Sequence, residues 1–274
     1  MFYALANRIG GFMPTTLDPD AQAYIDAVVA VGATVSGAQK KAISEFYATG
    51  KDEGWYANIK RLYLPIWAIA SPNAIDLITT NSGTFAGTVT HSAGYITGNG
   101  SNARMAMDTS PDALSIVDGD ASISCLIYAA GAGSSFRAVI GVTQTAKKSF
   151  RISRNTIAGA TTSAGSLGVD MNATDTTFGG IYVAGETTTT NRFFRVRKTA
   201  GVTSLATNTS SSTGGYPTIN AQIMAANNNS SFANFSNDSI GAAHIGLEFT
   251  TTQADQYSAA LKTMWETCTG LTLP

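Results

Sequence analysis

The sequence predicts a mainly β protein, built as an antiparallel sandwich or barrel, with a short N-terminal helical segment and a C-terminal amphipathic helix. Three observations lead to this fold class. Past residue 67, short runs rich in Val, Ile, Thr, Phe and Tyr alternate with clusters of Gly, Asn, Ser and Asp, which is typical of many-stranded antiparallel folds. Before residue 67, and again at the C-terminus, apolar residues recur at helical spacing. The predicted strands do not alternate with helices, so the pattern does not predict a parallel sheet.

Residues 1–67 are predicted to be helical. Asp18 can cap a first helix that ends near Gly32, and a second helix is expected over 36–50. A third short helix is expected over 55–63, where apolar residues recur three to four positions apart. Helices this short bury little surface alone, so we expect them to pack on the rest of the chain or on a partner.

Strands and turns account for most of the chain after residue 67. The last element is again a helix, with a capping box at Thr252–Asp255, an apolar face that includes Trp265, and Gly270 at its end. The predicted strands are Gly87–Thr97, Ala103–Asp108, Ala121–Ala129, Arg137–Thr143, Ser149–Arg154, Gly180–Val183, Arg192–Lys198, Asn220–Ala226 and Ala243–Phe249.

One glycine-rich stretch has the spacing of a dinucleotide-binding motif. Gly98, Gly100 and Ala103 fit G-x-G-x-x-A after a β-rich run. That motif must open a helix, whereas residues 104–108 have the character of a strand. We therefore expect a hairpin in which 104–108 pairs with 91–97, and no phosphate or cofactor site.

The sequence lacks the signatures of common catalytic sites. None of the glutamates begins the Glu-x-Asp-x-x-Glu pattern expected on a glycoside-hydrolase strand, although Asp108 and Glu248 could still converge in space. No serine occupies a G-x-S-x-G elbow. His91 and His244 lie in strand-like runs without neighbouring ligands, which favours structural roles over a base or a zinc site. We expect no enzyme and no catalytic residue.

Neither the acidic turn nor the cysteines predict a metal site. Asp118-Gly-Asp120 has the clustered oxygens of a calcium loop, and it equally has the composition of an ordinary turn, which is the preferred interpretation. Cys125 and Cys268 form no spaced framework and are expected to be buried thiols.

The charge distribution is uneven in one region. Residues 147–198 hold eight Lys or Arg side chains against three acidic ones. In the strand RFFRVRK alternate residues share a face, so Arg195 and Arg197 lie on the same side. We expect either a solvated sheet face or a contact through Arg192, Arg195 and Arg197 to an anionic neighbour, whether protein, lipopolysaccharide or, least of all, nucleic acid.

Aromatic residues stand among asparagines after residue 215. Tyr216, Phe232 and Phe235 lie near Asn228 and its neighbouring amides. Aromatic rings and convergent amides are groups with which sandwiches bind sugars, and they suit a subunit contact equally. Tyr216, Asn228, Phe232 and Phe235 are therefore the predicted glycan or partner contacts.

The composition favours packing against neighbours. Charged residues make up only 13% of the 274 residues, and the formal net charge is −1. The N-terminus lacks the pattern of a secretory signal, and no apolar run is long enough to cross a membrane. We expect a soluble protein made in a reducing cytoplasm, without membrane insertion.

Parts of the chain resemble a group of virion proteins from tailed bacteriophages and prophages. They are LDPDAQAYIDAV with the later WYANIKRLYLPIW, then GTVTHSAGYITGNGSNARMAMD, and AANNNSSFANFSNDSIGAAHIGLEFTTTQADQYSAALKTMWE. Within the hairpin segment, Thr90, His91, Ser92, Gly94 and the turn 98–101 match the group's pattern. The middle of the chain matches only in its strand pattern. The resemblance implies a jelly-roll sandwich of the concanavalin and laminin-G type, assembly in a bacterial cytoplasm and display on a particle, and it carries no catalytic residue.

The sequence thus predicts a non-enzymatic virion structural protein of the head, collar, tail or fibre. Residues 1–67 would attach the protein to other virion proteins or to further copies of itself, and residues 68–274 would form the displayed sandwich. Two alternatives stay open: a receptor-binding adhesin that recognises host-surface glycan, and a polysaccharide depolymerase.

Overall fold

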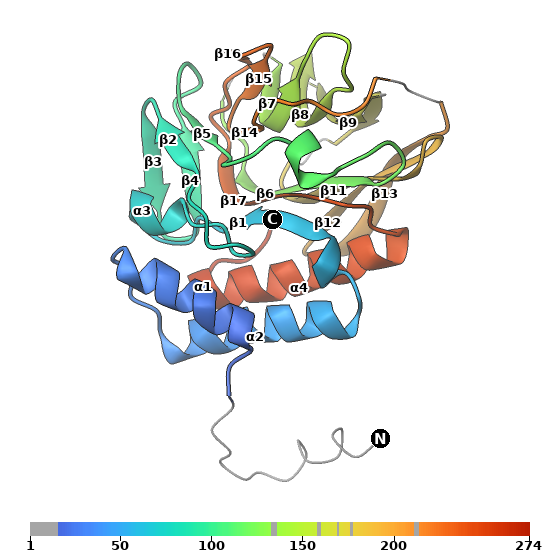
Figure 1. Ribbon diagram of the computed structural model, residues 1–274. Coiled ribbons are helices and arrows are strands. Elements are labelled where there is room, and N and C mark those ends of the chain that lie inside the picture. The colour runs from blue at the N-terminus through green and yellow to red at the C-terminus, as the bar shows by residue number, and fades with distance from the viewer. Residues whose placement is uncertain (1–15, 133–135, 158–159, 169, 176–177, 211–213) are drawn as a thin grey trace.

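The computed structural model describes residues 16–132, 136–157, 160–168, 170–175, 178–210 and 214–274. Two β-sheets face each other, and helices cover the outer side of one of them (Figure 1). We call that sheet the helix-covered sheet and the other the distal sheet. The mainly β sandwich predicted from the sequence is confirmed.

The strand order shows how the two sheets are built. The helix-covered sheet runs β13 (Gly201–Asn208), β12 (Asn191–Lys198), β11 (Gly180–Thr188), β6 (Ala121–Ala129), β17 (Ser239–Gly246), β4 (Tyr95–Gly98) and β3 (Val89–Ser92), and β1 (Ile59–Tyr63) also pairs with β17. The distal sheet runs β10 (Asp170–Thr174), β9 (Ala160–Leu167), β8 (Phe150–Ile157), β7 (Arg137–Thr143), β14 (Gln222–Ile223), β5 (Arg104–Ala106) and β2 (Thr84–Ala86). A hairpin of β15 (Ala226–Asn228) and β16 (Ser231–Ala233) joins the distal sheet through β15, which is parallel to β7.

The helices are α1 (Pro19–Ala30), α2 (Gly37–Asp52), the short α3 (Ala70–Asn73) and α4 (Thr251–Thr269), with 3₁₀ turns η2 (Tyr56–Asn58) and η3 (Asp112–Leu114). The capping box of α4 joins Thr250 to Gln253, two residues before the predicted one. Gly270, with φ of 72°, ends this helix as predicted. Within the described residues, no helix combines the length and the apolarity that crossing a bilayer requires.

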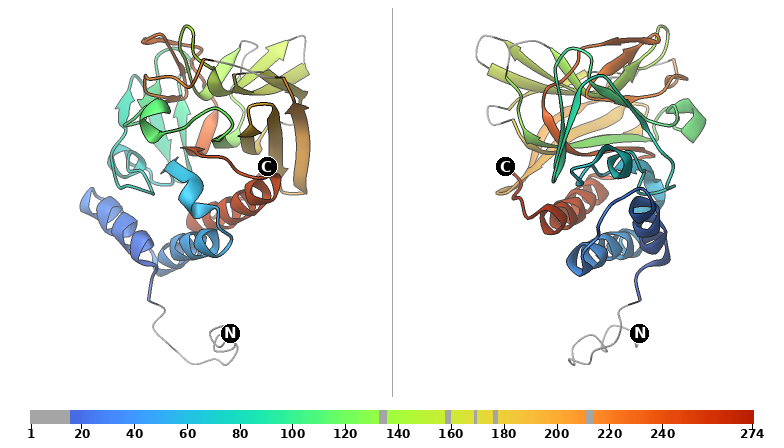
Figure 2. Two further views of the ribbon diagram at one scale, coloured as in Figure 1. Left: turned by 45° about the vertical axis from the view of Figure 1, so that its right-hand side comes forward. Right: turned by 90° about the vertical axis from the view of Figure 1, so that its left-hand side faces the viewer.

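Two hydrophobic layers hold the elements together. Along β11, Ile181 and Val183 pack towards the helices, whereas Tyr182 packs between the two sheets, as alternation along a strand requires. α4 lies against β11 and β12, α2 packs along α4, and α1 packs on α2 (Figures 1 and 2). Trp265 fixes α4 to the sheet edge, because its indole N–H donates to the Gly94 carbonyl at 2.8 Å.

One predicted helix is a strand. Residues 59–63 form β1, which pairs with β17 in the helix-covered sheet. Ile59 and Leu62 pack among the helices, and Tyr63 packs between the sheets. The edge of β17 offers backbone partners to a segment buried on both faces, and this pairing overrides the helical spacing of the apolar residues. The first 67 residues therefore contribute a strand to the sandwich as well as two helices.

Both cysteines are free and buried, as expected. Cys125 lies between the sheets, and burial raises the pKa of its thiol well above the usual value. Cys268 faces the sheet from α4, and burial raises its pKa to about 12. Such thiols stay protonated and unreactive at neutral pH.

Candidate functional site

The glycine-rich stretch crosses from one sheet to the other. β4 ends at Gly98, and β5 pairs with β2 in the distal sheet, so the predicted hairpin between 104–108 and 91–97 is wrong; β3 pairs with β4 instead. The Asn99 side-chain oxygen accepts hydrogen bonds at 3.0–3.1 Å from the backbone N–H groups of Ser101, Asn102 and Ala103. A phosphate would need these same N–H groups, so the loop offers it no cradle.

The basic face of β12 is covered by the chain's own C-terminal helix. Arg195 forms a bidentate ion pair with Asp255 of α4, with both N···O distances at 2.8 Å. Arg197 donates to the Ser258 hydroxyl at 2.9 Å and to the Asp255 carbonyl at 2.7 Å. Arg192 points the other way and is buried between the sheets. These three arginines are therefore engaged within the chain, and the carboxylate that pairs with Arg195 comes from α4.

Arg192 belongs to a buried charged cluster at one end of the space between the sheets. Glu186 is fully buried and accepts hydrogen bonds from Lys148 at 3.1 Å, from the Arg192 guanidinium and from the Tyr216 hydroxyl. Lys148 also lies 3.1 Å from an Asp118 oxygen. Burial, followed by the Glu186 charge, raises the pKa of Tyr216. Tyr216 is only 1% exposed, so its predicted role as a glycan contact is contradicted.

Asp118 and Asp120 lie in a turn before β6. Gly119 has φ of 83°, and Asp120 accepts a hydrogen bond from the Glu248 N–H at 2.6 Å. Asp118 faces the ammonium group of Lys148. Among the side chains that the structure describes, no group of three or more His, Cys, Asp or Glu could hold a metal ion. Burial, followed by repulsion from Asp120, raises the pKa of the Glu248 carboxyl.

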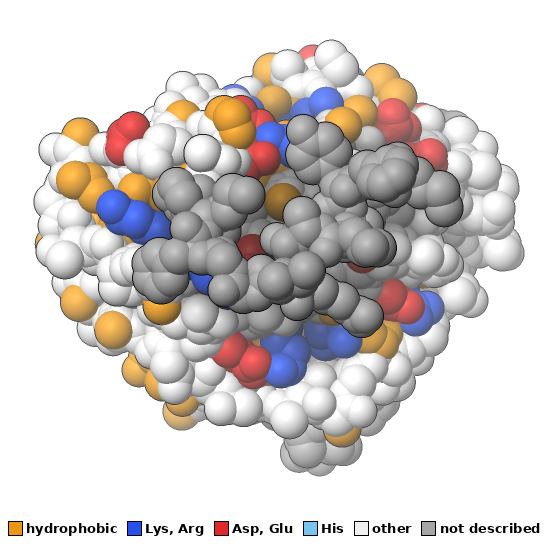
Figure 3. Space-filling view, turned by 90° about the horizontal axis from the view of Figure 1, so that it is seen from below, with side chains coloured by type: hydrophobic (Ala, Val, Ile, Leu, Met, Phe, Trp, Pro, Cys, Tyr) orange, Lys and Arg blue, Asp and Glu red, His pale blue; other side chains and the backbone are white. Residues whose placement is uncertain are grey.

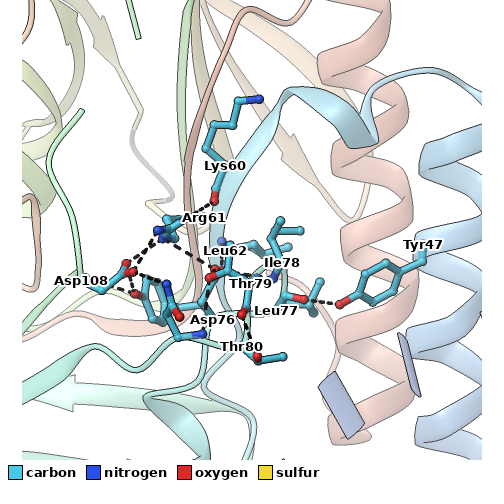
Figure 4. Close-up of polar contacts among 12 residues, drawn as sticks. Tyr47, Lys60, Arg61, Leu62, Asp76, Leu77, Ile78, Thr79, Thr80 and Asp108 are labelled. Carbon is cyan, nitrogen blue, oxygen red and sulfur yellow. Dashed lines mark hydrogen bonds and ion pairs between the residues drawn. The ribbon is translucent and has the colours of Figure 1, made fainter. Parts of the chain in front are cut away.

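A second polar cluster joins β1 to two loops (Figure 4). Asp76 is fully buried and accepts hydrogen bonds from the Leu62 N–H at 2.8 Å and from the Thr79 N–H and hydroxyl at 3.0 and 2.6 Å. Arg61 reaches from β1 to Asp108 in a bidentate pair at 2.7 and 2.9 Å. Burial opposes ionisation of Asp108, but the hydrogen bonds from Arg61, Asn81 and Tyr63 and the charge of Arg61 together outweigh it and lower the pKa of Asp108. The Asp108 carboxylate is thus engaged in holding β1.

The histidines have structural surroundings. His244 is fully buried and stacks on Phe249 with ring centres 5.2 Å apart, and burial lowers its pKa to about 3. His91 is half-buried, with Nδ1 3.0 Å from the Asn73 side-chain nitrogen, and burial also lowers its pKa. Both rings are neutral at pH 7, which suits packing.

The remaining predicted glycan contacts lie at or directly after the β15–β16 hairpin, on the outer side of the distal sheet. Asn228 is exposed, Phe232 is 38% exposed, and Phe235 is half-buried. The guanidinium of Arg104, on β5, lies 3.7 Å from the centre of the Phe232 ring. Arg104 was not predicted from the sequence, because its contact with Phe232 joins residues 128 positions apart.

The hairpin is held in place by its turn. Asn229 and Ser230 have φ of 50° and 67°, which is typical of the two-residue turns that match the twist of paired strands. The Asn229 N–H donates to the Thr143 carbonyl at 3.0 Å, and its side-chain oxygen accepts from the Thr145 N–H at 2.6 Å. These bonds fix the turn to the end of β7. The hairpin is therefore held in a fixed position on the distal sheet.

Two surface hollows flank α4. A groove of about 640 Å³ lies between α2 and α4, with small residues and carboxylates on its walls. A second hollow of about 410 Å³ lies where β12 and β13 meet the start of α4, and Thr and Asn side chains line most of it. Seen from the helical side, acidic and basic side chains lie next to one another rather than in separate patches (Figure 3).

Comparisons with known proteins find similarity in structure but not in sequence. No family model matches the chain, and no curated protein matches it. A sialidase from Trypanosoma rangeli has a TM-score of 0.51 at 6% identity, over 81% of this chain and 39% of the sialidase. Domain 4 of an extracellular arabinanase from Geobacillus stearothermophilus, solved with arabinotriose, has a TM-score of 0.49 at 11% identity, over 73% of this chain and 98% of that domain. Tailspike protein 2 of the Escherichia coli O157:H7 bacteriophage CAB120 has a TM-score of 0.42 at 9% identity, over 66% of this chain and 26% of the tailspike.

These similarities correct one prediction and limit what can be inferred from the fold. The expectation that the chain is not an enzyme is contradicted, because this fold also occurs in the sialidase structure. At 6% identity the likeness shows the fold alone, and the two matches with TM-scores below 0.5 are too distant to support a shared role. The chain spans 39% of the sialidase and 26% of the tailspike. What is shown is a β-sandwich architecture that also occurs in the sialidase structure.

Proposed function

We propose that the protein is a component of a tailed-bacteriophage particle and that its sandwich binds a glycan of the host surface at the β15–β16 hairpin. The observation that carries the glycan site is the exposed Phe232 ring, held on a fixed hairpin with the Arg104 guanidinium 3.7 Å from its centre. The sequence resemblance to phage virion proteins supports the particle.

The chemistry of the hairpin suits a sugar. A pyranose ring presents apolar C–H groups that pack on an aromatic ring, and hydroxyls that bond to amides and guanidinium groups. Phe232 offers the first, and Arg104 offers the second. Because the turn is tied to β7, little conformational entropy would be lost when a ligand binds.

Replacing Phe232 with alanine is expected to weaken glycan binding roughly tenfold, since truncation of a central aromatic contact typically costs more than 1 kcal/mol. The measurement is binding of the purified full-length chain to a glycan array and to host cells. The melting temperature should stay unchanged, because the ring is 38% exposed.

Val117→Ala is the matched control, because it removes an apolar side chain that is 54% exposed in a different loop. It should bind as the unaltered chain does. A wild-type chain that binds no glycan, or a Phe232→Ala variant that binds as well as Val117→Ala, would remove the basis for this site.

Attachment to the particle or to other copies is assigned to the N-terminal segment 1–67. A cut at residue 67 is a poor test, because it removes β1 from the sheet and uncovers the core beneath α4. Deleting residues 1–15, which are rich in apolar side chains, leaves α1, α2 and β1 intact. The deletion is expected to keep the melting temperature and to lose co-sedimentation with particles; full incorporation of the shortened chain would show that these 15 residues are not the attachment.

A further inference from the structure

We propose that the glycan bound at the β15–β16 hairpin carries a carboxylate and that Arg104 is the residue that recognises it. This rests on the proposed function and adds to it the chemical class of the sugar, an acidic one such as a uronic or sialic acid. The proposal depends on the position of Arg104 on β5 and on its surroundings.

Arg104 lies on the outer face of the distal sheet. Its neighbour Met105 is fully buried between the sheets, so alternation along β5 directs Arg104 outward. The guanidinium carbon lies 3.7 Å from the centre of the Phe232 ring, and this contact restrains the guanidinium group. A planar guanidinium held in this way is pre-organised for a carboxylate, which it can bind through two parallel hydrogen bonds.

The surroundings of Arg104 differ from those of the arginines within the fold. Arg61, Arg192 and Arg195 each form an ion pair with a carboxylate of the chain. Arg104 has no such partner among the residues that the structure describes. Its charge is therefore uncompensated within the described chain, and it lies beside the exposed aromatic ring proposed to hold the sugar.

A second arginine lies on the same face. Register places Ala106 opposite Gln222, Gln222 opposite Gly141, and Gly141 opposite Arg151, so this row crosses from β5 to β8. Three strand spacings separate its ends by about 14 Å. Arg151 also lies over a ring, that of Phe136, at 5.3 Å. Beyond Arg151 the register continues through Ser166 to Asp170 on β10. We therefore assign the carboxylate to Arg104 alone.

The experiment compares acidic glycans with uncharged forms of the same molecules. The full-length chain is tested at low ionic strength on an array of uronic-acid and sialylated oligosaccharides, each printed as the free acid and as the methyl ester. The free acids are expected to bind about tenfold to a hundredfold more tightly than the esters, the range for hydrogen bonds to charged groups. This preference should weaken as salt is added.

Arg104→Gln is expected to abolish the difference between acid and ester and to keep residual binding through Phe232. Arg104→Lys keeps the positive charge but lacks the paired N–H donors of a guanidinium, and it should retain only part of the preference for the free acid. Lys41→Gln is the matched control, since it removes the same charge from an exposed site on α2, and it should leave the preference intact. Melting temperatures of all variants establish that each is folded.

The outcomes separate this inference from the proposed function. Binding to neutral glycans that is lost in Phe232→Ala, with no preference for free acids, would retain the proposed site and overturn the role of Arg104. An acid preference that persists in folded Arg104→Gln would also overturn it. Failure to bind any glycan, acid or neutral, would overturn both.

Discussion

Replacing Glu186 with glutamine is expected to lower the free energy of unfolding by about 3 kcal/mol, because it leaves the buried Arg192 and Lys148 without their shared carboxylate. All three side chains are 3% exposed or less. Lys148 keeps Asp118 at 3.1 Å, and this remaining partner places the expected loss at the lower end of the range for broken buried ion pairs. Urea denaturation of the purified chain at neutral pH measures it.

Glu45→Gln is the control for the loss of one negative charge. Glu45 forms an exposed i,i+4 pair with Lys41 on α2, and side-chain exposures of 62% and 69% make such a pair worth less than about 1 kcal/mol. The urea midpoint of the Glu45→Gln variant should stay close to that of the unaltered chain. Equal midpoints for Glu186→Gln and Glu45→Gln would show that the cluster between the sheets adds nothing to stability.

Replacing His244 with glutamine is expected to remove a large part of the pH dependence of stability between pH 6.5 and 4.5. Burial lowers the pKa of His244 to about 3, whereas the unfolded chain binds a proton at this residue near pH 6.5. Between these values the unfolded state holds more protons, so stability falls as the pH falls, by about 1.4 kcal/mol per pH unit from this residue. Because the unfolded residue is already half protonated at pH 6.5, the native chain should lose about 2 kcal/mol more than the variant across those two units.

Unfolding free energies of both proteins at a series of pH values measure this difference. Glutamine is chosen because its amide can replace the contact between His244 and the Ser124 hydroxyl without titrating. His91→Gln is the control, since His91 is only half-buried and should leave most of the pH dependence in place. If the free energy of unfolding depends on pH in the same way for the native chain and for His244→Gln, the lowered pKa of His244 is refuted.

The strands that the sequence predicted best are those whose apolar residues are bounded by turns. β6 and β7 have the predicted limits, Ala121–Ala129 and Arg137–Thr143. β9 and β13, by contrast, are rich in Thr, Ser and Ala and have no apolar alternation. They are strands because a neighbouring strand offers hydrogen bonds along their whole length, which a local pattern does not reveal.

The candidate site was predictable only in part. The pattern of aromatic residues among asparagines selected Phe232 and Asn228, which the structure places on an exposed hairpin, but it also selected Tyr216, which is buried against Glu186. Composition describes what a residue can contact, not which side of a sheet it faces. The alternation of Tyr182, Ala184 and Glu186 along β11 was the signal that could have located the buried cluster.

The sequence by itself determined the fold class, most of the strands of the inter-sheet core and the C-terminal end of α4, because these depend on local periodicity, turn residues and caps. Only the tertiary structure decided that residues 59–63 are a strand and that the arginines of β12 face α4. It also decided that Arg104 lies on Phe232, and in each case the partner is distant in sequence. The local pattern predicts which secondary structure a segment prefers, by about 1 kcal/mol. Packing decides which segments become neighbours, and backbone hydrogen bonds or ion pairs with a neighbour outweigh that preference.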